Sequence, residues 1–336
     1  MPRCKLKNCP YGSNGRCVEN QLPNCPNLLP DIQPGSELIE EAASQAPQTA
    51  PPPPTHETLY SGKKLTADEA APILQSNPQV VILGGMVESG KTTLLARIFE
   101  MFQCGAVTGY RFMNSRTPVE FDKLSWHATM ECGAASPKTE HTYRTENNLF
   151  LHLRIRPDTG SAPPVDLLIG DIPGEVFPEA IAEESVCRDL YALGRANHLL
   201  LFLDSGVLCD TAKRHDHCGK IFDFVLRALQ TGQIGQHTVL HLVISKSDLL
   251  PKDVASEVLK FVESTERTFR TRFASRVGGL NSWRLAARPE HTFEPTLTKI
   301  NEVFRVWTTR ATPHADTFMK APQRSNFQRD FCRFGL

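Results

Sequence analysis

The sequence predicts an α/β fold of three layers, α/β/α, in which helices cover both faces of a mostly parallel sheet. The chain has 336 residues, which is enough for one large core and some appendages. Hydrophobic residues make up 40% of the chain and charged residues 22%, as in ordinary globular proteins. From about residue 59 onward, short apolar runs alternate with amphipathic helical patterns. This alternation is typical of parallel strands joined by helices.

The charge balance and the lack of long apolar runs argue against several kinds of binding partner and against a membrane-spanning helix. The 37 basic and 37 acidic side chains give a formal net charge of zero, which argues against binding DNA or an anionic membrane through the whole surface. No run approaches the ~18 apolar residues of a membrane-spanning helix. The first residues lack an apolar signal core, and neither end carries a lipid-attachment motif. We therefore expect a cytoplasmic protein without a nucleic acid partner.

Composition divides the chain into four segments. Residues 1–30 hold four of the ten cysteines among Pro, Gly and Asn, which indicates a small cysteine-rich module. Residues 31–58 are rich in Pro and poor in large apolar side chains, so we expect a linker. Residues 59–310 carry the strand and helix patterns of the main domain, and residues 311–336 form a mixed aromatic and basic tail.

The first elements of the main domain follow from local patterns. Thr66 and Glu69 form a capping-box pattern that opens a short helix, which Pro72 should kink or end early. Residues 80–83 are a continuous apolar run of the buried-strand type. The segment after Lys91 predicts a helix, because its apolar residues share one face. These residues are Leu94, Leu95, Ile98, Phe99 and Phe102.

The later elements are an antiparallel hairpin, two buried strands and three helices. Residues 149–155 alternate between apolar and polar, residues 165–169 are apolar, and turn residues separate the two runs, which predicts the hairpin. Apolar runs predict strands at residues 198–203 and 239–244. Helical spacing of apolar residues predicts helices at residues 221–229, 254–262 and 297–307.

The turn between the strand at residues 80–83 and the helix after Lys91 matches a phosphate-binding pattern. Its sequence fits G-x-x-x-x-G-K-[ST], and a strand before it and a helix after it support the match. Glycines let backbone N–H groups converge on a phosphate, and the helix N-terminus adds positive potential. Lys91 would reach the β and γ oxygens, and Thr92 can ligate Mg²⁺. The expected nucleotide-binding residues are Gly85, Val87, Glu88, Ser89, Gly90, Lys91, Thr92 and Thr93.

A second motif follows the strand predicted at residues 165–169. Asp171 and Gly174 form an Asp-x-x-Gly pattern at the end of this strand. After a phosphate-binding loop, such an Asp can hold Mg²⁺ through water. Gly174 could offer its backbone N–H to a γ-phosphate and move when that phosphate leaves. An ordinary turn at the end of a strand is the alternative.

A third motif follows the strand predicted at residues 239–244. Its sequence, Ser245-Lys246-Ser247-Asp248, resembles the N/T-K-x-D motif of guanine recognition. With three such motifs in this order, each at a strand end, residues 78–310 resemble the Ras-like P-loop GTPases. The long segment between the first two motifs, the Asp-Ile-Pro-Gly-Glu run at residues 171–175 and the lack of a membrane anchor look more like the bacterial double-GTPase type than like small eukaryotic Ras homologues.

The resemblance implies roles for the residues that would surround the base. Asp248 would accept hydrogen bonds from the guanine N1–H and 2-amino groups, and Lys246 would pack its stem along the base. Adenine lacks this pair of donors, so the carboxylate would reject ATP. Ser245 stands where the family usually has Asn. Ala286 is the candidate for a base contact in a fifth motif, and a core strand end is the alternative.

Two features bear on hydrolysis. Glu175 follows the second motif, where Ras-like proteins commonly have the Gln that orients the attacking water. A carboxylate could orient that water or accept its proton, but it also repels the γ-phosphate, so turnover should be slow without an activator. A Glu at a helix start is the alternative. Switch I must lie between residues 104 and 148, where Thr139 is our candidate Mg²⁺ ligand and Thr142 and Thr145 fit equally well.

The amino-terminal cysteines suggest a metal site. Cys4, Cys9, Cys17 and Cys25 supply four thiolates, the ligand number of a tetrahedral Zn²⁺ site, in a segment too short to fold around its own core. Because the spacing lacks a Cys-x-x-Cys pair, free thiols and two disulfides stay as alternatives. The other six cysteines are scattered, and we expect free thiols there.

Together these features predict a Mg²⁺-dependent guanine-nucleotide switch. It would bind GTP and GDP, hydrolyse GTP to GDP and phosphate, and signal to an unidentified protein effector or activator. Lys91, Thr92, Asp171, Gly174 and Glu175 are the candidate catalytic residues, and the cysteine module would dock a protein partner. Two alternatives stay open: a P-loop ATPase, which Ser245 keeps possible, and a nucleotide-binding scaffold with little turnover, which Glu175 favours.

Overall fold

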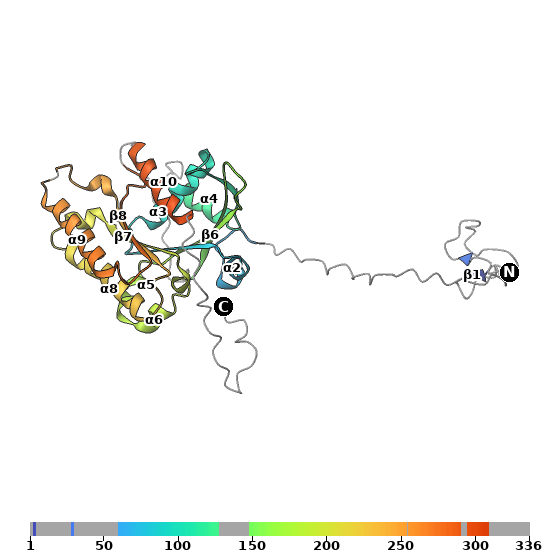
Figure 1. Ribbon diagram of the computed structural model, residues 1–336, viewed down its shortest axis with the longest axis horizontal. Helices are drawn as coiled ribbons and strands as arrows, with labels where there is room; N and C mark the ends of the chain where they lie inside the picture. The colour runs from blue at the N-terminus through green and yellow to red at the C-terminus, as the bar shows by residue number, and fades with distance from the viewer. Residues whose placement is uncertain are drawn as a thin grey trace, which may run out of the picture. The chain divides into compact units, whose positions relative to one another are not determined.

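The computed structural model describes residues 3–4, 28–29, 60–127, 148–253, 255–289 and 294–308. Contacts divide the chain into two units, Met1–Thr58 and Leu59–Leu336 (Figure 1). In the first unit, β1 (Arg3–Cys4) pairs antiparallel with β2 (Leu28–Leu29). The linker, Thr139, the tail and the side chains of Cys4, Cys9, Cys17 and Cys25 lie outside the described residues. The zinc site and the four-segment division therefore stay predictions.

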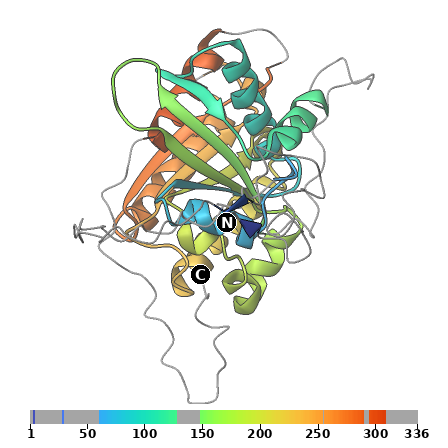
Figure 2. The same cartoon turned by 90° about the vertical axis from the view of Figure 1, so that its right-hand side faces the viewer.

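A seven-stranded sheet forms the centre of the second unit, in the order β4-β5-β6-β3-β7-β8-β9. Strands β6, β3, β7, β8 and β9 are parallel, whereas β5 runs antiparallel to both its neighbours, β4 and β6. The mostly parallel sheet and the hairpin of β5 and β6 are as predicted. The light green loop that joins β5 to β6 projects from the domain in Figure 2. The strands are β3 (Gln79–Gly85), β4 (Tyr110–Asn114), β5 (Phe150–Pro157), β6 (Val165–Asp171), β7 (His198–Asp204), β8 (Val239–Ser245) and β9 (Gly279–Arg284).

Helices cover both faces of the sheet, which confirms the three layers (Figure 1). One face carries α3 (Lys91–Cys104), α4 (Pro118–His127) and α10 (Glu294–Thr308). The other carries α2 (Ala67–Leu74), α5 (Val176–Ala182), α6 (Glu184–Arg188), α8 (Arg214–Gln230) and α9 (Glu257–Phe273). Along β3, Val81 and Leu83 face the first group, and Val80 and Ile82 face the second. The central strands β3, β7 and β8 are mostly apolar, as expected for strands buried on both faces.

Most local signals in the sequence produced the expected elements. Thr66 caps α2 in a capping box with Glu69, and the helix ends two residues after Pro72. All five apolar residues predicted for one face of α3 are buried. Helix α9 begins at residue 257, later than predicted, because the hydroxyl of Ser256 accepts the backbone N–H of Leu259 at 3.2 Å and caps the helix there.

Several elements were not predicted from the sequence, and they include the edge strand β4, the ten-residue helix α4 and the short helix α5. Strand β4 is exposed over four of its five residues, so it shows no apolar alternation. Pro178 lies within α5, and proline is a signal against a helix interior. The remaining short elements are α6, α7 (Ser205–Cys209), η3 (Leu193–Arg195) and η4 (Ser247–Leu249). Helix α7 directly follows β7, η4 directly follows β8, and η3 comes shortly before β7.

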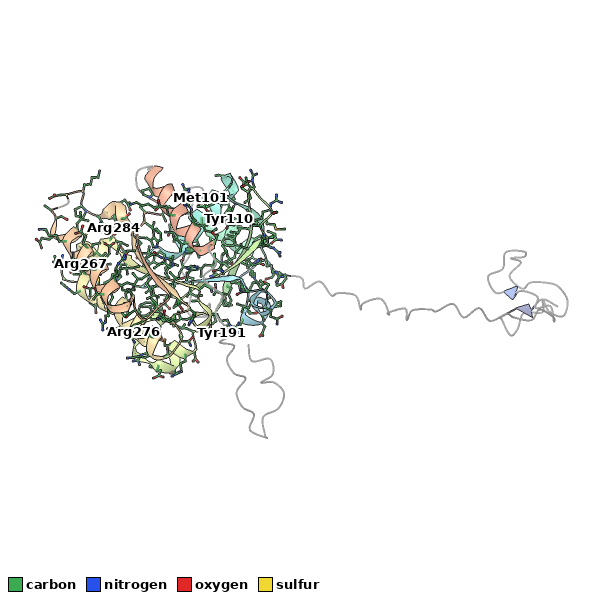
Figure 3. The ribbon with its side chains drawn as sticks, in the orientation of Figure 1. Met101, Tyr110, Tyr191, Arg267, Arg276 and Arg284 are labelled. Atoms are coloured by element: carbon green, nitrogen blue, oxygen red, sulfur yellow. The ribbon has the colours of Figure 1, made fainter. Side chains whose placement is uncertain are left out.

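Charged side chains lie mainly on the outside of the domain, as Arg267 and Arg276 do in Figure 3. Arg284 instead pairs with Glu266, with its Nη2 atom 2.7 Å from the Oε2 atom. Within the described ranges, no helix is long and apolar enough to cross a membrane.

Two buried histidine rings and one partly buried tryptophan ring link three neighbouring strands. His198 on β7 and His241 on β8 lie with their Nδ1 and Nε2 atoms 3.1 Å apart, and the indole Nε1–H of Trp283 on β9 donates to Nδ1 of His241 at 3.0 Å. Because Nδ1 of His241 accepts a hydrogen bond, its proton lies on Nε2 and is donated to His198. Burial lowers the pKa of His198 to about 4 and that of His241 to about 3. Both rings are therefore neutral in the fold at neutral pH.

We expect this pair to make the domain sensitive to acid. An unfolded histidine has a pKa of about 6.5, so below that pH the unfolded chain binds protons that the folded chain excludes. Stability that is present above pH ~6.5 is then lost as the pH falls, by up to about 1.4 kcal/mol per pH unit for each histidine. Urea unfolding between pH 7 and pH 5 measures this slope. A His198→Leu/His241→Leu double variant should reduce this slope, and the remainder comes from His152 and His217, whose pKa values burial also lowers. An equal slope in both proteins would contradict the assignment.

Candidate functional site

The loop after β3 and the start of α3 form the first part of the site. Glu88 and Gly90 have φ angles of 61° and 88°, a left-handed conformation that suits glycine. Gly90 occupies the N-cap position of α3 and has no side chain to cap the helix. The first amide groups of a 14-residue helix thus begin directly after the loop. Such an arrangement of backbone N–H donors suits an anion such as a phosphate.

Lys91 is the first residue of α3, directly after this loop. Its side chain is buried, and its Nζ atom donates to the carbonyl oxygens of Gly85 at 3.0 Å and Met86 at 3.1 Å. Burial lowers the pKa of the Lys91 ammonium group, and the nearby charge of Asp171 opposes that effect. Two backbone carbonyls therefore hold the amine at the loop, where it can contact a bound anion.

Thr92 and Asp171 meet beside the loop. Asp171 is the last residue of β6, and the parallel pairing of β3 with β6 sets it opposite Leu83. The Thr92 hydroxyl donates to Oδ2 of Asp171 at 3.2 Å. Hydroxyl and carboxylate oxygens are donors that Mg²⁺ prefers, so this pair fits the ion. The third predicted magnesium ligand, Thr139, lies outside the described residues.

Gly174 brings the second loop against the first. A Cβ atom at Gly174 would lie 2.4 Å from the backbone nitrogen of Val87 and 2.7 Å from its Cα. Only glycine fits there, because side-chain carbons do not approach backbone atoms so closely. Glu175 is exposed and occupies the N-cap position of α5. This is the position expected under the alternative to a water-orienting role, a Glu at a helix start. The Asp-x-x-Gly segment is thus in direct contact with the predicted phosphate loop.

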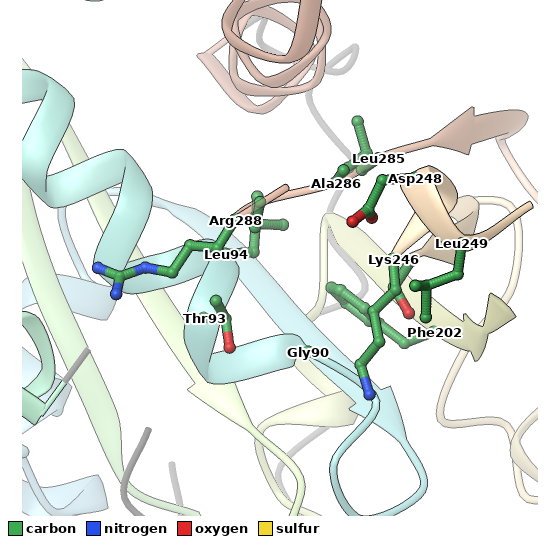
Figure 4. Close-up of a pocket in the computed structure, with 12 residues that line it drawn as sticks. Gly90, Thr93, Leu94, Phe202, Lys246, Asp248, Leu249, Leu285, Ala286 and Arg288 are labelled. Atoms are coloured by element: carbon green, nitrogen blue, oxygen red, sulfur yellow. The ribbon is translucent and has the colours of Figure 1, made fainter. Parts of the chain in front are cut away.

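A cavity of about 240 Å³ opens beside the start of α3 (Figure 4). Four segments line it: the start of α3, strand β7, the loop after β8 and the loop after β9. Five predicted site residues, Gly90, Thr93, Lys246, Asp248 and Ala286, lie together in this lining, and the Asp248 carboxylate points into the cavity. The other lining residues are Leu94, Phe202, Ser245, Leu249, Leu285, Ala287 and Arg288.

Backbone hydrogen bonds hold the two loops of the cavity together. The N–H of Ser247 donates to the carbonyl of Leu285 at 3.0 Å, and the N–H of Leu285 donates to the carbonyl of Ile244 at 2.9 Å. These bonds bring Ala286 to the cavity wall. Ser245 is buried, and its hydroxyl donates to the carbonyl of Leu203 at 3.1 Å. Ser245, which stands where the guanine-recognition motif usually has Asn, therefore joins the ends of β7 and β8.

Sequence patterns missed three residues of this region. Phe202 lines the cavity from β7, and Arg288 lines it while pairing with Glu100 of α3. Asp204, the last residue of β7, accepts a hydrogen bond at Oδ2 from Nζ of Lys246 at 2.6 Å. The one available signal was its position, since Asp204 and Asp171 both end an apolar parallel strand.

Other candidate ligands do not assemble near the site. Four of the six scattered cysteines, Cys104, Cys187, Cys209 and Cys218, are free thiols as predicted, and Cys132 and Cys332 lie outside the described residues. Among the residues with described positions, no group of three or more His, Cys, Asp or Glu side chains could hold a metal ion.

Comparisons with known proteins identify relatives of the chain. A family described as Double-GTPase 2 matches residues 79–308. No curated protein matches the sequence.

Several solved structures resemble parts of the chain. The signal recognition particle receptor SRb-GTP/SRX complex from Chaetomium thermophilum is 13% identical, covering 67% of this chain and 98% of that chain, with a TM-score of 0.34. Translation elongation factor SelB from Methanococcus maripaludis, in complex with the GTP analogue GPPNHP, is 12% identical, covering 68% of this chain and 33% of that chain, with a TM-score of 0.34. This chain thus spans about a third of the SelB chain.

Proposed function

The chain is a P-loop GTPase of the double-GTPase type, a member of the Double-GTPase 2 family that matches residues 79–308, and from this premise we propose a Mg²⁺-dependent switch that hydrolyses GTP to GDP and phosphate and signals to a protein partner. One observation supports the proposal most strongly. The loop at residues 85–92, the segment at residues 171–174 and the loop at residues 245–248 meet at the carboxyl ends of β3, β6 and β8. Ligands of open α/β sheets bind at this edge.

The phosphates would lie on the loop at residues 85–92. The amides at the start of α3 and the Lys91 ammonium group would neutralise the β- and γ-phosphates. Thr92 and Asp171 would hold Mg²⁺, which supplies positive charge to the phosphate oxygens when bound. The γ-phosphate would lie near Gly174, whose contact with Val87 joins the segment at residues 171–174 to the loop at residues 85–92.

The switching segment would be the stretch from Gly174 into α5. Because Gly174 contacts the phosphate loop, release of a γ-phosphate can change the position of the residues that follow. Exposed Glu175 is the candidate for orienting the attacking water, and its negative charge opposes approach to the γ-phosphate. We therefore propose slow turnover without an activator. A scaffold with little turnover is the alternative, and single-turnover phosphate release with and without cell extract separates the two.

The guanine base would occupy the cavity that Asp248 faces. We expect unlabelled GTP and GDP, but not ATP, to displace fluorescent GTP from the intact protein in the presence of Mg²⁺. An Asp248→Asn variant should bind GTP about a hundredfold more weakly, because its amide replaces a charged acceptor of two hydrogen bonds. Equal displacement by ATP would contradict guanine recognition and favour the ATPase alternative.

The cysteine-rich module would serve as a docking element for a protein partner. Its zinc site rests on the count and spacing of Cys4, Cys9, Cys17 and Cys25 in the sequence. Metal analysis of the purified protein, with a Cys→Ser variant at all four positions as the control, tests this part of the proposal separately from nucleotide binding.

A further inference from the structure

Asp204 lies at the junction of three elements beside the proposed base site. It is the last residue of β7 and the N-cap of α7, where its Oδ1 atom accepts the backbone N–H of Gly206 at 2.7 Å. Its own backbone N–H donates to Nε2 of His217 on α8 at 3.0 Å. The residue is buried, so these bonds leave it little freedom to move.

The second carboxylate oxygen of Asp204 holds Lys246. Oδ2 lies 2.6 Å from Nζ of Lys246, and the side chains are 11% and 41% exposed. Lys246 has a φ of 50°, a conformation that costs a residue other than glycine roughly 1–2 kcal/mol. A charge-assisted hydrogen bond of this kind can offset that cost. The ion pair therefore helps to fix both the backbone and the stem of Lys246.

The strand ends around this pair are also joined. The hydroxyl of Ser205 donates to the carbonyl of Ser245 at 2.5 Å, and the hydroxyl of Ser245 donates to the carbonyl of Leu203 at 3.1 Å. Parallel pairing sets Asp204 directly opposite Ser245. Asp204 is thus part of a rigid frame, whereas Lys246 is the partly exposed member of the pair and lines the cavity (Figure 4).

We propose that Asp204 is a positioning residue that sets the affinity for the guanine base by holding the Lys246 stem along the cavity wall. This assignment rests on the proposed function, because it assumes that the cavity takes the base. Lys246 without its anion would sample several rotamers, and binding would then have to order the side chain again. The effect should depend on the base and not on the number of phosphates.

An Asp204→Asn variant tests the assignment on the intact protein. The amide keeps the shape of the side chain and can still accept from Gly206, but it carries no charge for Lys246. We expect GTP and GDP affinities to fall together by about tenfold, while the weaker binding of ATP stays unchanged. The melting temperature should fall by only about 2–4 °C, because the ion pair no longer offsets the backbone cost at Lys246. Asp210→Asn is the matched control, because Asp210 pairs with Lys213 at 3.2 Å on an exposed surface outside the cavity lining.

A double-mutant cycle distinguishes positioning from a general structural role. Lys246→Met removes the ammonium group and keeps the stem. If Asp204 acts through Lys246, Asp204→Asn should have little further effect in the Lys246→Met background. Additive losses, or unchanged GTP affinity in Asp204→Asn, would overturn the assignment and leave the proposed function intact. A wild-type protein that binds no GTP would overturn both.

Discussion

Replacement of Lys91 by alanine is expected to abolish measurable binding of GTP, a loss of about a hundredfold or more in affinity. The Lys91 amine lies within the proposed phosphate loop, where it donates to Gly85 and Met86 and can exchange these carbonyls for phosphate oxygens. Hydrogen bonds between charged groups contribute about 1.5–3 kcal/mol each, so the loss of two accounts for this magnitude. Fluorescent GTP titration with Mg²⁺ measures the change.

The fold should survive this substitution. Burial lowers the pKa of the Lys91 ammonium group, which means that the buried charge costs the protein free energy. Removing it should leave the melting temperature close to that of the wild type. Lys91→Met, which keeps most of the side-chain volume, is the second variant in case alanine opens the loop. Full GTP affinity in a folded Lys91→Met protein would refute the phosphate site.

Replacement of Gly174 by alanine is expected to impair both stability and nucleotide binding. The added carbon would lie 2.4 Å from the Val87 nitrogen and 2.8 Å from the Met86 carbonyl carbon, so backbone atoms must move apart. Overpacking of this kind costs about 1–3 kcal/mol of unfolding free energy. Because the displaced atoms belong to the phosphate loop, we also expect GTP affinity to fall by at least tenfold. Urea unfolding and GTP titration measure the two effects.

Gly219 supplies the matched control for this substitution. It lies within α8, and a Cβ atom there would meet no heavy atom within 4 Å. Alanine is favoured over glycine in a helix by up to about 1 kcal/mol, so Gly219→Ala should bind GTP normally and be equally or more stable. If Gly174→Ala behaved like Gly219→Ala, the contact between the two loops would not be needed for binding.

The described structure bears out the sequence predictions unevenly. Where the signal is contiguous, as at Thr66 and Glu69 or along β3, the predicted element is present. Strand β4 gave no signal because its residues are largely exposed at an edge of the sheet. Helix α9 begins later than predicted because the cap at Ser256, and not the first apolar residue, sets its start.

The sequence by itself determined which strongly patterned strands and helices occur and in what order they follow along the chain. It also determined the phosphate-binding loop and the candidates Asp171 and Asp248 at strand ends. It could do so because each of these features lies within about ten consecutive residues and depends on local periodicity or turn chemistry.

Only the tertiary structure decided which of these residues meet. The pairs Thr92 with Asp171 and Asp204 with Lys246 are separated by 79 and 42 residues in the chain. The contact of Gly174 with Val87 likewise joins two loops that follow different strands. The pairing register of β3 with β6 and of β7 with β8 sets these distances. Register arises from packing of the whole sheet against its helices, and no local segment of the sequence carries that information.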